Sequence, residues 1–433
     1  MKASNPREYG PSVKPAPVFA ALACICLAWC AWTEDSGATG EVVRTEAMTI
    51  EHPNLPAGYE MAAYVDCGGQ EATGDKTEAG IALVTGAAHT FPGIEGPLAA
   101  VTYDASAVQY EITGLDREAE YIVGFTWWDV DNAGRVQSVR FGTGEPMEWT
   151  TVLPPVRAAA YYKNKPTWAH VLLPVTPEFR KNDRFVVAFA KEAGPNAVVN
   201  EIWLLKKTGS TPRKRVLIVT GDDYPGHLWR ETAPEFARIL RADPRLEVSI
   251  TECPAIYGSP LMMHYDATML HFKNYPERLP LGADVGEGLV RFAESGRGVV
   301  LVHFGGGAFQ EWDGFEQLAG RIWNPELRGH DPYGTFTVRI EDASHPITAG
   351  MKDFDVEDEL YTCLDGEPEI QVLCAATSRV DQKDYPMAFI VPAFPKVFHS
   401  VLGHGVASLQ SDGARALYRR ASAWAAGLEP EMP

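Results

Sequence analysis

The spacing of hydrophobic and polar positions changes about halfway along the chain. Residues 41–207 carry short apolar runs, such as 121–127, 185–190 and 198–205, separated by turn sequences rich in Gly, Asp, Asn and Pro. No stretch in this half keeps a helical period, which is typical of an all-β fold. We therefore predict a β-sandwich over residues 41–207.

Beyond a basic linker at residues 208–215, apolar strands alternate with amphipathic helices. Strands are predicted at 216–220, 246–251, 268–272 and 299–302, with helices at 232–242 and 283–294. Later strands are predicted near 336–340, 370–375, 387–390 and 397–402, and a last helix near 412–426. This alternation predicts a doubly wound parallel α/β sheet over residues 216–428.

The first 38 residues differ from everything that follows. Three basic residues precede an uncharged apolar run at 17–32, which has the length of a signal-peptide core and is short for a membrane span. We predict export to the periplasm or the extracellular space, with cleavage after Cys30 or Ala38. An uncleaved anchor is the alternative, and ALAC at 21–24 resembles a degenerate lipoprotein box, so lipidation also stays open.

The composition and charge of the chain exclude some classes of binding partner. The chain has 433 residues and a formal net charge of −19, and it has no basic stripe that could neutralise nucleic acid or an anionic membrane surface. Outside the N-terminal apolar run the cysteines are Cys67, Cys253, Cys363 and Cys374, without a CxxC pair. One disulfide is compatible with this spacing, none is required, and a zinc–thiolate site is disfavoured.

The stretch GVVLVHFGGGAF at 298–309 predicts a buried strand that ends in His303 and a glycine run. Ligands gather at the carboxyl ends of strands in open α/β sheets, and glycines such as Gly306 let backbone N–H groups approach a ligand. We therefore predict a binding turn here. The alternative is a tight connection that carries a core histidine.

Histidines of the second half are concentrated at predicted strand ends and loops: His227, His271, His303, His330, His345, His399 and His404. Neutral imidazoles next to a carboxylate bind divalent metals, and imidazole also moves protons near neutral pH. No HxH or HExxH spacing occurs, so only the fold could assemble such a site. As a set they predict a polar cleft, although each one alone is compatible with a hydrogen-bonded structural role.

Carboxylates for this cleft are found in EDELY at 357–361, which contains Asp358, Glu359 and Tyr361. The run lies between two predicted strands, where its acids could act as a base or as metal ligands. A solvated turn is the alternative. Asp222 and Asp223, after the first strand, are the next candidates.

Four tryptophans of the first half could stack on a pyranose ring: Trp127, Trp128, Trp149 and Trp168. Strand alternation predicts that one residue of the Trp127–Trp128 pair points inward and the other outward, and Trp128 is kept as the binding candidate. A structural role in the core is the alternative. The motifs VDCGG at 65–69 and VNEIWLLKK at 199–207 resemble those of malectin-like or galactose-binding-like sandwiches, which implies a sugar-binding module.

Four motifs in the second half, in this order, are similar to the trehalose-utilisation (ThuA-like) family: GDDYPGHLWRETAP, LVHFGGGAFQEWDGFEQLAG, RGHDPYGTFTVRIEDASHPITAGMKDFDVEDELY and LGHG. The resemblance implies a flavodoxin-like, class I glutamine amidotransferase-like domain associated with sugar catabolism, in particular of 3-keto-glycosides. The family positions carried over are His227, Trp229, His303, Trp312, His330, His345, Asp358, Glu359, Tyr361 and His404.

The sequence departs from its relatives at two places. The amidotransferase nucleophile would be a Cys at the turn after the 299–302 strand, where this chain has His303, so we predict that it is not a glutamine amidotransferase. The expected GxGR-type turn before the last strand is VPAFP at 391–395, which is predicted to reshape one rim of the cleft.

Together these features predict an exported enzyme, a hydrolase, lyase or isomerase, that acts on a carbohydrate by acid–base chemistry with or without one divalent metal ion. The predicted catalytic residues are His303, His330, Glu359 and His404. The predicted substrate-binding residues are His227, Trp229, Gly306, Trp312, His345, Asp358, Tyr361 and Trp128. The alternative is a non-catalytic carbohydrate-binding protein, and a scaffold that holds protein partners is a third, less supported possibility.

Overall fold

The structure is a computed structural model. It describes residues 55–431 apart from 69–71, 74–78, 93–98, 160, 163–164, 167, 210, 212, 224–225, 310–311 and 313. The predicted export segment and its cleavage sites lie outside the described residues. Every described residue belongs to one compact unit, Glu51–Pro433, and no helix of this described part is long and apolar enough to cross a membrane.

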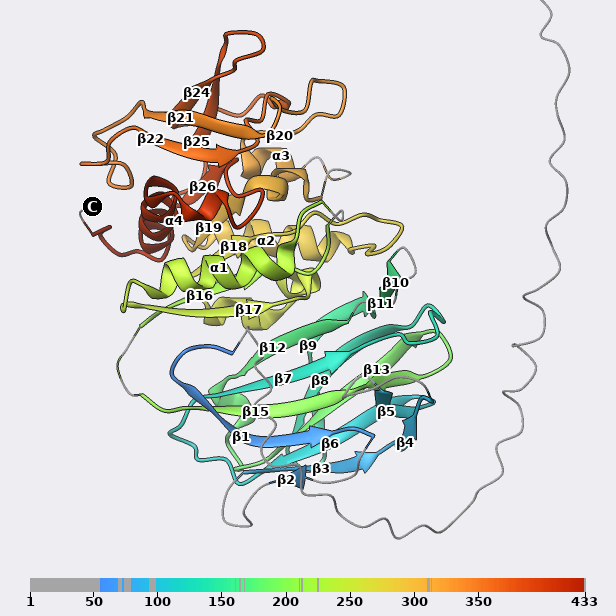
Figure 1. Ribbon diagram of the computed structural model, residues 1–433. Helices are drawn as coiled ribbons and strands as arrows, with labels where there is room; N and C mark the ends of the chain where they lie inside the picture. Colours follow the sequence, from blue (N-terminus) through green and yellow to red (C-terminus); the bar gives the residue numbers. More distant parts are fainter. Residues whose placement is uncertain are drawn as a thin grey trace, which may run out of the picture. The chain divides into compact units, whose positions relative to one another are not determined.

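The first half is all-β, as predicted, and its described strands pair antiparallel (Figure 1). One five-stranded sheet has the order β12 (Ala169–Val175), β7 (Tyr121–Trp127), β15 (Glu201–Lys207), β1 (Tyr59–Asp66), β2 (Ala72–Thr73). A second has the order β3 (Gly80–Thr85), β6 (Ala107–Thr113), β13 (Phe185–Ala193), β8 (Val136–Thr143), β9 (Glu148–Arg157). The smaller elements are β14 (Ala197–Val199), β5 (Ala100–Asp104), β4 (Ala87–Thr90), the pair β10 (Tyr161–Tyr162) and β11 (Lys165–Pro166), and η2 (Pro177–Phe179).

The second half is built on a nine-stranded mixed sheet. Its parallel part has the order β17 (Leu246–Thr251), β16 (Lys214–Val219), β18 (Ala267–Leu270), β19 (Gly298–Val302), β26 (Val397–Ser400). In chain order this is 2-1-3-4-5, the flavodoxin-like arrangement that the sequence predicts. The strands β25 (Asp384–Ile390), β24 (Gln371–Thr377), β21 (Gly334–Ile340) and β22 (Phe354–Asp358) then extend the sheet antiparallel.

The antiparallel extension corrects the expectation of a wholly parallel sheet. The connection between β25 and β26 is residues 391–396, which is too short for the crossover that parallel strands need. The VPAFP turn lies in this connection, and the Phe394 N–H donates to the Val391 carbonyl. It precedes β26, so it lies at the opposite edge of the sheet from the residues that follow β19 and β26. The prediction that it shapes a rim of the cleft is therefore wrong.

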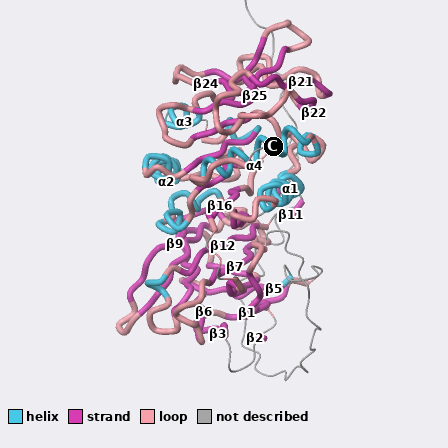
Figure 2. Tube along the Cα trace, turned by 90° about the vertical axis from the view of Figure 1, so that its left-hand side faces the viewer, coloured by secondary structure: helices cyan, strands magenta, loops and turns pink. Residues whose placement is uncertain are grey.

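Helices cover both faces of this sheet (Figure 2). On one face α1 (Trp229–Arg241) and α4 (Asp412–Ala425) bury Phe236, Leu240 and Leu417 against the strands. On the other face lie α2 (Ala283–Glu294) and α3 (Gly314–Ala319). The remaining elements are the short helices η3 (Pro254–Gly258), η4 (Pro260–His264), η5 (His303–Gly307) and η6 (Ser408–Gln410) and the strand pair β20 (Ile322–Trp323) and β23 (Leu364–Asp365).

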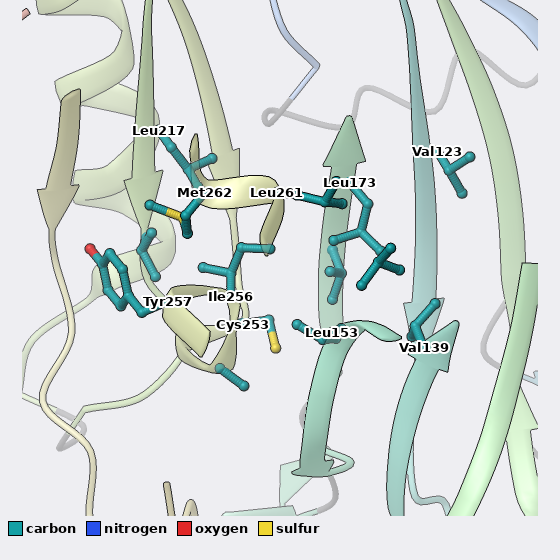
Figure 3. Close-up of a cluster of buried hydrophobic side chains, with 14 of the residues drawn as sticks. Val123, Val139, Leu153, Leu173, Leu217, Cys253, Ile256, Tyr257, Leu261 and Met262 are labelled. Carbon is teal, nitrogen blue, oxygen red and sulfur yellow. The ribbon is translucent and has the colours of Figure 1, made fainter. Parts of the chain in front are cut away.

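One apolar cluster joins the sandwich to the α/β half. Leu153 and Leu173 of the sandwich strands lie in the same buried cluster as Ile256 and Met262 of η3 and η4 (Figure 3). At the edge of the sheet, the Glu252 N–H donates to the carbonyl of His170 in β12 at 2.8 Å. The open edge of β17 is thereby covered, so the sandwich is a structural support for the sheet that carries the site described below.

Candidate functional site

The loops after β16, β19 and β26 bring three histidines to the carboxyl edge of the parallel strands. His227 lies between β16 and α1, His303 follows β19 directly, and His404 follows β26. Glu359 comes from the antiparallel side, one residue beyond the end of β22. This is the edge of an open α/β sheet at which ligands bind.

Asp358, the last residue of β22, ties that strand to the loop after β26. Its carboxylate accepts the N–H groups of Gly403 at 2.7 Å, Glu359 at 2.8 Å and His404 at 3.2 Å. The side chain is fully enclosed, and burial raises the pKa of Asp358 to about 6 although these three donors oppose the shift. Asp358 therefore positions Glu359 and His404 and is itself shielded from solvent.

His303 starts the turn after β19 in a backbone conformation that few side chains adopt. Its φ is 41°, and such local strain is concentrated at functional sites. Its Nδ1 lies 2.5 Å from the Val401 carbonyl, which can only accept, so Nδ1 carries the proton and Nε2 holds the lone pair. Burial lowers the pKa of His303 to about 4, which keeps the ring neutral at pH 7.

His227 is held in a similar way. Its Nδ1 lies 2.7 Å from an Asp223 carboxylate oxygen, and its ring stacks on Phe304 at a centroid distance of 4.6 Å. The ring is 5.1 Å from that of His303 and 4.9 Å from that of His404, centroid to centroid. A carboxylate that accepts the Nδ1–H of an imidazole is the arrangement found behind metal-binding histidines.

Glu359 lies between three histidine side chains. One carboxylate oxygen is 3.3 Å from His404 Nδ1 and 3.6 Å from His303 Nε2, and the other is 3.4 Å from His330 Nε2. Burial alone would raise the pKa of Glu359, but His303 and His404 outweigh it and hold the pKa below its ordinary value. In return, the carboxylate raises the pKa of His404.

The four residues His227, His303, Glu359 and His404 each offer one ligand atom, and these atoms all lie within 4.8 Å of one another. His404 Nδ1 is buried and has no hydrogen-bond partner of acceptable geometry, despite its closeness to Glu359. Three imidazole nitrogens and one carboxylate are the ligands of Zn²⁺, Fe²⁺ and related ions. The donor set thus fits one divalent cation. We refer to these four residues as the His/Glu cluster.

Two more predicted residues border the cluster. Tyr361 is buried, its hydroxyl lies 2.8 Å from His303 Nε2, and burial raises its pKa well above the ordinary value, so it is a hydrogen-bond donor. His330 pairs with Tyr361 through an isolated β-bridge, and its Nδ1 lies 2.7 Å from the Asp331 carbonyl. The His330 side chain is 36% exposed, which leaves it accessible to solvent at the rim.

Three positions carried over from the family motif lie outside the cluster. Trp229 opens α1 and its ring carries the Arg230 guanidinium at 4.2 Å. Trp312 packs on α2, where a Cβ on Gly286 would lie 2.7 Å from its ring. His345 accepts the Ile347 N–H at 3.2 Å and contacts a ring of α4. Packing and local hydrogen bonds account for these side chains.

The glycine run also has a packing explanation. A Cβ on Gly305 would lie 2.7 Å from the Leu270 carbonyl, and one on Gly306 would lie 3.1 Å from the His399 ring. The turn therefore needs glycine in order to pack closely on the sheet. His399 and His271 are buried core histidines that are not part of the cluster.

The expectation for the tryptophan pair is wrong. β7 ends at Trp127, so strand alternation no longer applies to Trp128, and both rings are buried, at 1% and 2% exposure. Trp128 therefore offers no open stacking face. Among the candidates, Trp149 has the exposed side chain, at 41%.

The comparison with family models decides the classification of the α/β half. Residues 215–425 match the ThuA model, described as trehalose utilisation. The α/β half is a ThuA-family domain. No functionally curated protein matches the chain.

Solved structures similar to this chain include ThuA-like proteins and an amidotransferase. A ThuA-like protein from Parabacteroides merdae is 21% identical over 51% of this chain and 92% of its own, with a TM-score of 0.43. One from Bacteroides uniformis is 17% identical over 50% and 93%, with a TM-score of 0.42. A glutamine amidotransferase from Thermotoga maritima is 11% identical over 44% and 76%, with a TM-score of 0.30.

The cysteines of the ThuA-like domain are protonated thiols at neutral pH. Cys253, Cys363 and Cys374 are free and buried, and burial raises the pKa of each to about 12. The turn position after β19 that would carry a nucleophile holds His303 instead. Within the described residues no disulfide joins these cysteines to each other or to Cys67.

Proposed function

We propose that the ThuA-like domain is a carbohydrate-acting enzyme whose His/Glu cluster binds one divalent cation. The observation that carries this proposal is the convergence of three imidazoles and one carboxylate, whose ligand atoms all lie within 4.8 Å of one another. The Nδ1–H groups of His227 and His303 are held by Asp223 and by the Val401 carbonyl, which supports metal ligation through Nε2.

A bound ion would polarise a substrate oxygen or lower the pKa of a water molecule. The protein's own proton carrier is His330, because its side chain is partly exposed to solvent and its Nε2 lies 3.4 Å from Glu359. The Tyr361 hydroxyl donates to His303 Nε2 in this structure; when that nitrogen binds the ion, the hydroxyl would be released to donate to a substrate oxygen. A metal ion and a proton carrier of this kind would serve a hydrolase, a lyase or an isomerase.

Two features support a carbohydrate as the substrate. The family model is described as trehalose utilisation. At the rim, Tyr333 is 43% exposed and its ring lies 5.7 Å from that of His404, so an apolar face is offered beside the polar cluster. A pyranose ring needs this combination of an aromatic face and polar groups. The N-terminal apolar run supports action outside the cytoplasm.

Metal content is the first measurement that tests this function. We expect about one equivalent of a divalent metal in the purified protein, and we expect chelation to remove it. The His404→Ala variant should bind this metal about 100-fold less tightly than the wild type. His345→Ala is the matched control, because His345 lies outside the cluster and should retain the metal. Elemental mass spectrometry measures the metal content of both variants, and circular dichroism checks that both are folded. Equal metal content in the two variants would contradict the assignment.

One observation favours the second candidate, carbohydrate binding by the sandwich. Trp149 pairs across β8 and β9 with Gly142, where a Cβ would lie 2.8 Å from the indole, so the glycine makes room for the ring on the outer sheet face. Beside it is a cavity of about 570 Å³ whose lining includes Gly142, Met147, Glu111 and Arg184. An exposed indole next to hydrogen-bonding side chains suits a sugar ring.

Replacing this indole should reveal whether the sandwich binds glycans. We expect Trp149→Ala to weaken glycan binding by about tenfold in calorimetry, because the stacking face is lost. Tyr103→Ala removes another exposed aromatic of the sandwich, 38% accessible, and should change nothing. If Trp149→Ala bound every glycan as well as the wild type, the sandwich would keep only its supporting role.

A further inference from the structure

Lys273 lies at the same sheet edge as the His/Glu cluster, in the loop after β18. Its backbone N–H donates to the Asp222 carbonyl at 3.0 Å, and its side chain runs along the turn after β19, where a Cβ on Gly307 would lie 2.9 Å from Lys273 Cδ. The Nζ atom is 5.5 Å from the ring centroids of both Tyr275 and Trp323. The ammonium is therefore half-buried between two aromatic side chains.

The other cations of this neighbourhood have carboxylate partners. Arg278 pairs with Asp222 at 2.6 Å, and Arg230 pairs with Glu252 at 3.2 Å. In the part of the chain that the structure describes, Lys273 Nζ forms no ion pair. Burial lowers its pKa, and the charge of Asp223, which holds His227, opposes that shift. A half-buried ammonium is costly unless an anion compensates it.

A line of ring contacts leads from this ammonium to the cluster. The Trp323 ring, which contacts Lys273 Nζ, is 5.1 Å from the Tyr361 ring, centroid to centroid. The Tyr361 hydroxyl in turn donates a hydrogen bond to His303 Nε2. The ammonium and the cluster are thus linked through the Trp323 and Tyr361 rings.

We propose that Lys273 recognises an anionic group on the carbohydrate, so that the ThuA-like domain acts on an acidic sugar. This inference rests on the proposed function, because it assumes a sugar at the His/Glu cluster. The Trp323 and Tyr275 rings would contact the C–H face of the sugar, and the ammonium would pair with its anion. Lysine recognises carboxylate and phosphate alike as a point charge, so a sugar acid and a sugar phosphate are the two sources of this chemistry.

Calorimetry on the intact protein with three probes of one ring type tests the inference: D-glucuronate, D-glucose 6-phosphate and D-glucose. We expect wild type to bind at least one of the two anionic probes about tenfold or more tightly than glucose, with a preference that falls as salt is added. The acid that binds more tightly identifies the source of the anion. Lys273→Met should abolish the preference and leave glucose binding unchanged, whereas Lys273→Arg should retain part of it.

The outcomes separate this inference from the proposed function. A preference for the acids that survives in Lys273→Met, or equal binding of all three probes by wild type, would overturn the role of Lys273 and leave the function standing. Binding of none of the probes would overturn both the carbohydrate substrate and the inference. Metal content, measured on the same samples, reports on the His/Glu cluster independently of Lys273.

Discussion

Replacing Glu359 by Gln should lower turnover of a carbohydrate substrate by about 1,000-fold, the scale of a lost acid–base group or metal ligand. Glu359 is the carboxylate that His303, His330 and His404 share, and the amide cannot supply its negative charge. Without that charge the pKa of His404 should fall, and the affinity for a divalent cation should fall with it. The measurement is kcat and metal affinity in parallel.

The neighbouring Glu357 provides a matched control. Its side chain is exposed on β22, two residues away, and its backbone carbonyl accepts the hydroxyls of Ser408 and Tyr333. Glu357→Gln therefore removes one acidic charge from the same strand without touching the cluster. Equal turnover by the two variants would exclude Glu359 from the chemistry. A loss of kcat in Glu359→Gln with unchanged metal affinity would favour acid–base catalysis without a metal.

The parallel part of the fold can be predicted from the sequence because buried strands are apolar on both faces. Residues 216–219 and 299–302 are continuous apolar runs followed by turn residues, and both are strands. The direction of the strands in the antiparallel extension is harder to predict. β24 and β25 have equally apolar centres, and strand direction is set by the length of the connections, which hydrophobic periodicity does not encode.

The core of the site could be predicted for a related reason. His227, His303 and His404 follow strands that end at one edge of the sheet, and topology alone brings such positions together. Glu359 was accessible only through the EDELY run and the family motif. Nothing in the sequence distinguishes these residues from Trp312 and His345, which occupy motif positions but pack on helices.

Some features of the site left no signal in the sequence. Lys273 is an ordinary lysine in a polar loop, and only the fold places it beside the Tyr275 and Trp323 rings while Asp222 and Asp223 pair with Arg278 and His227. The anchoring of His303 by the Val401 carbonyl likewise depends on backbone placement. Such contacts arise between residues far apart in the chain, so only the folded structure contains them.

Acidification should unfold the protein between about pH 6 and pH 5. Four histidines outside the His/Glu cluster, two of them buried and two partly buried, have their pKa lowered by desolvation, to about 3 for His170 and His271 and to about 4 for His264 and His399. Because the folded pKa is below the unfolded value, the unfolded chain binds more protons below pH 6.5, and stability falls as the pH falls. At pH 5 each of them costs about 2 kcal/mol.

Two buried carboxyls oppose this effect without cancelling it. Burial raises the pKa of Asp222 and Asp358 to about 6, so the folded state takes up these protons first and gains stability as the pH falls. Their combined gain at pH 5 is about 3 kcal/mol, against about 8 kcal/mol lost through the histidines. The net loss of about 5 kcal/mol is as large as the whole stability of many domains.

Urea unfolding at pH 7.5, 6.0 and 5.0, followed by tryptophan fluorescence with a chelator present, measures this loss without a contribution from bound metal. The matched variant is His399→Gln, because His399 is fully buried and its Nε2 has no partner. Whatever its stability at pH 7.5, this variant should lose about 2 kcal/mol less than wild type on going to pH 5.0. An equal loss in the two proteins would mean that His399 is not protonated on unfolding, and a stability independent of pH would contradict the buried-histidine mechanism as a whole.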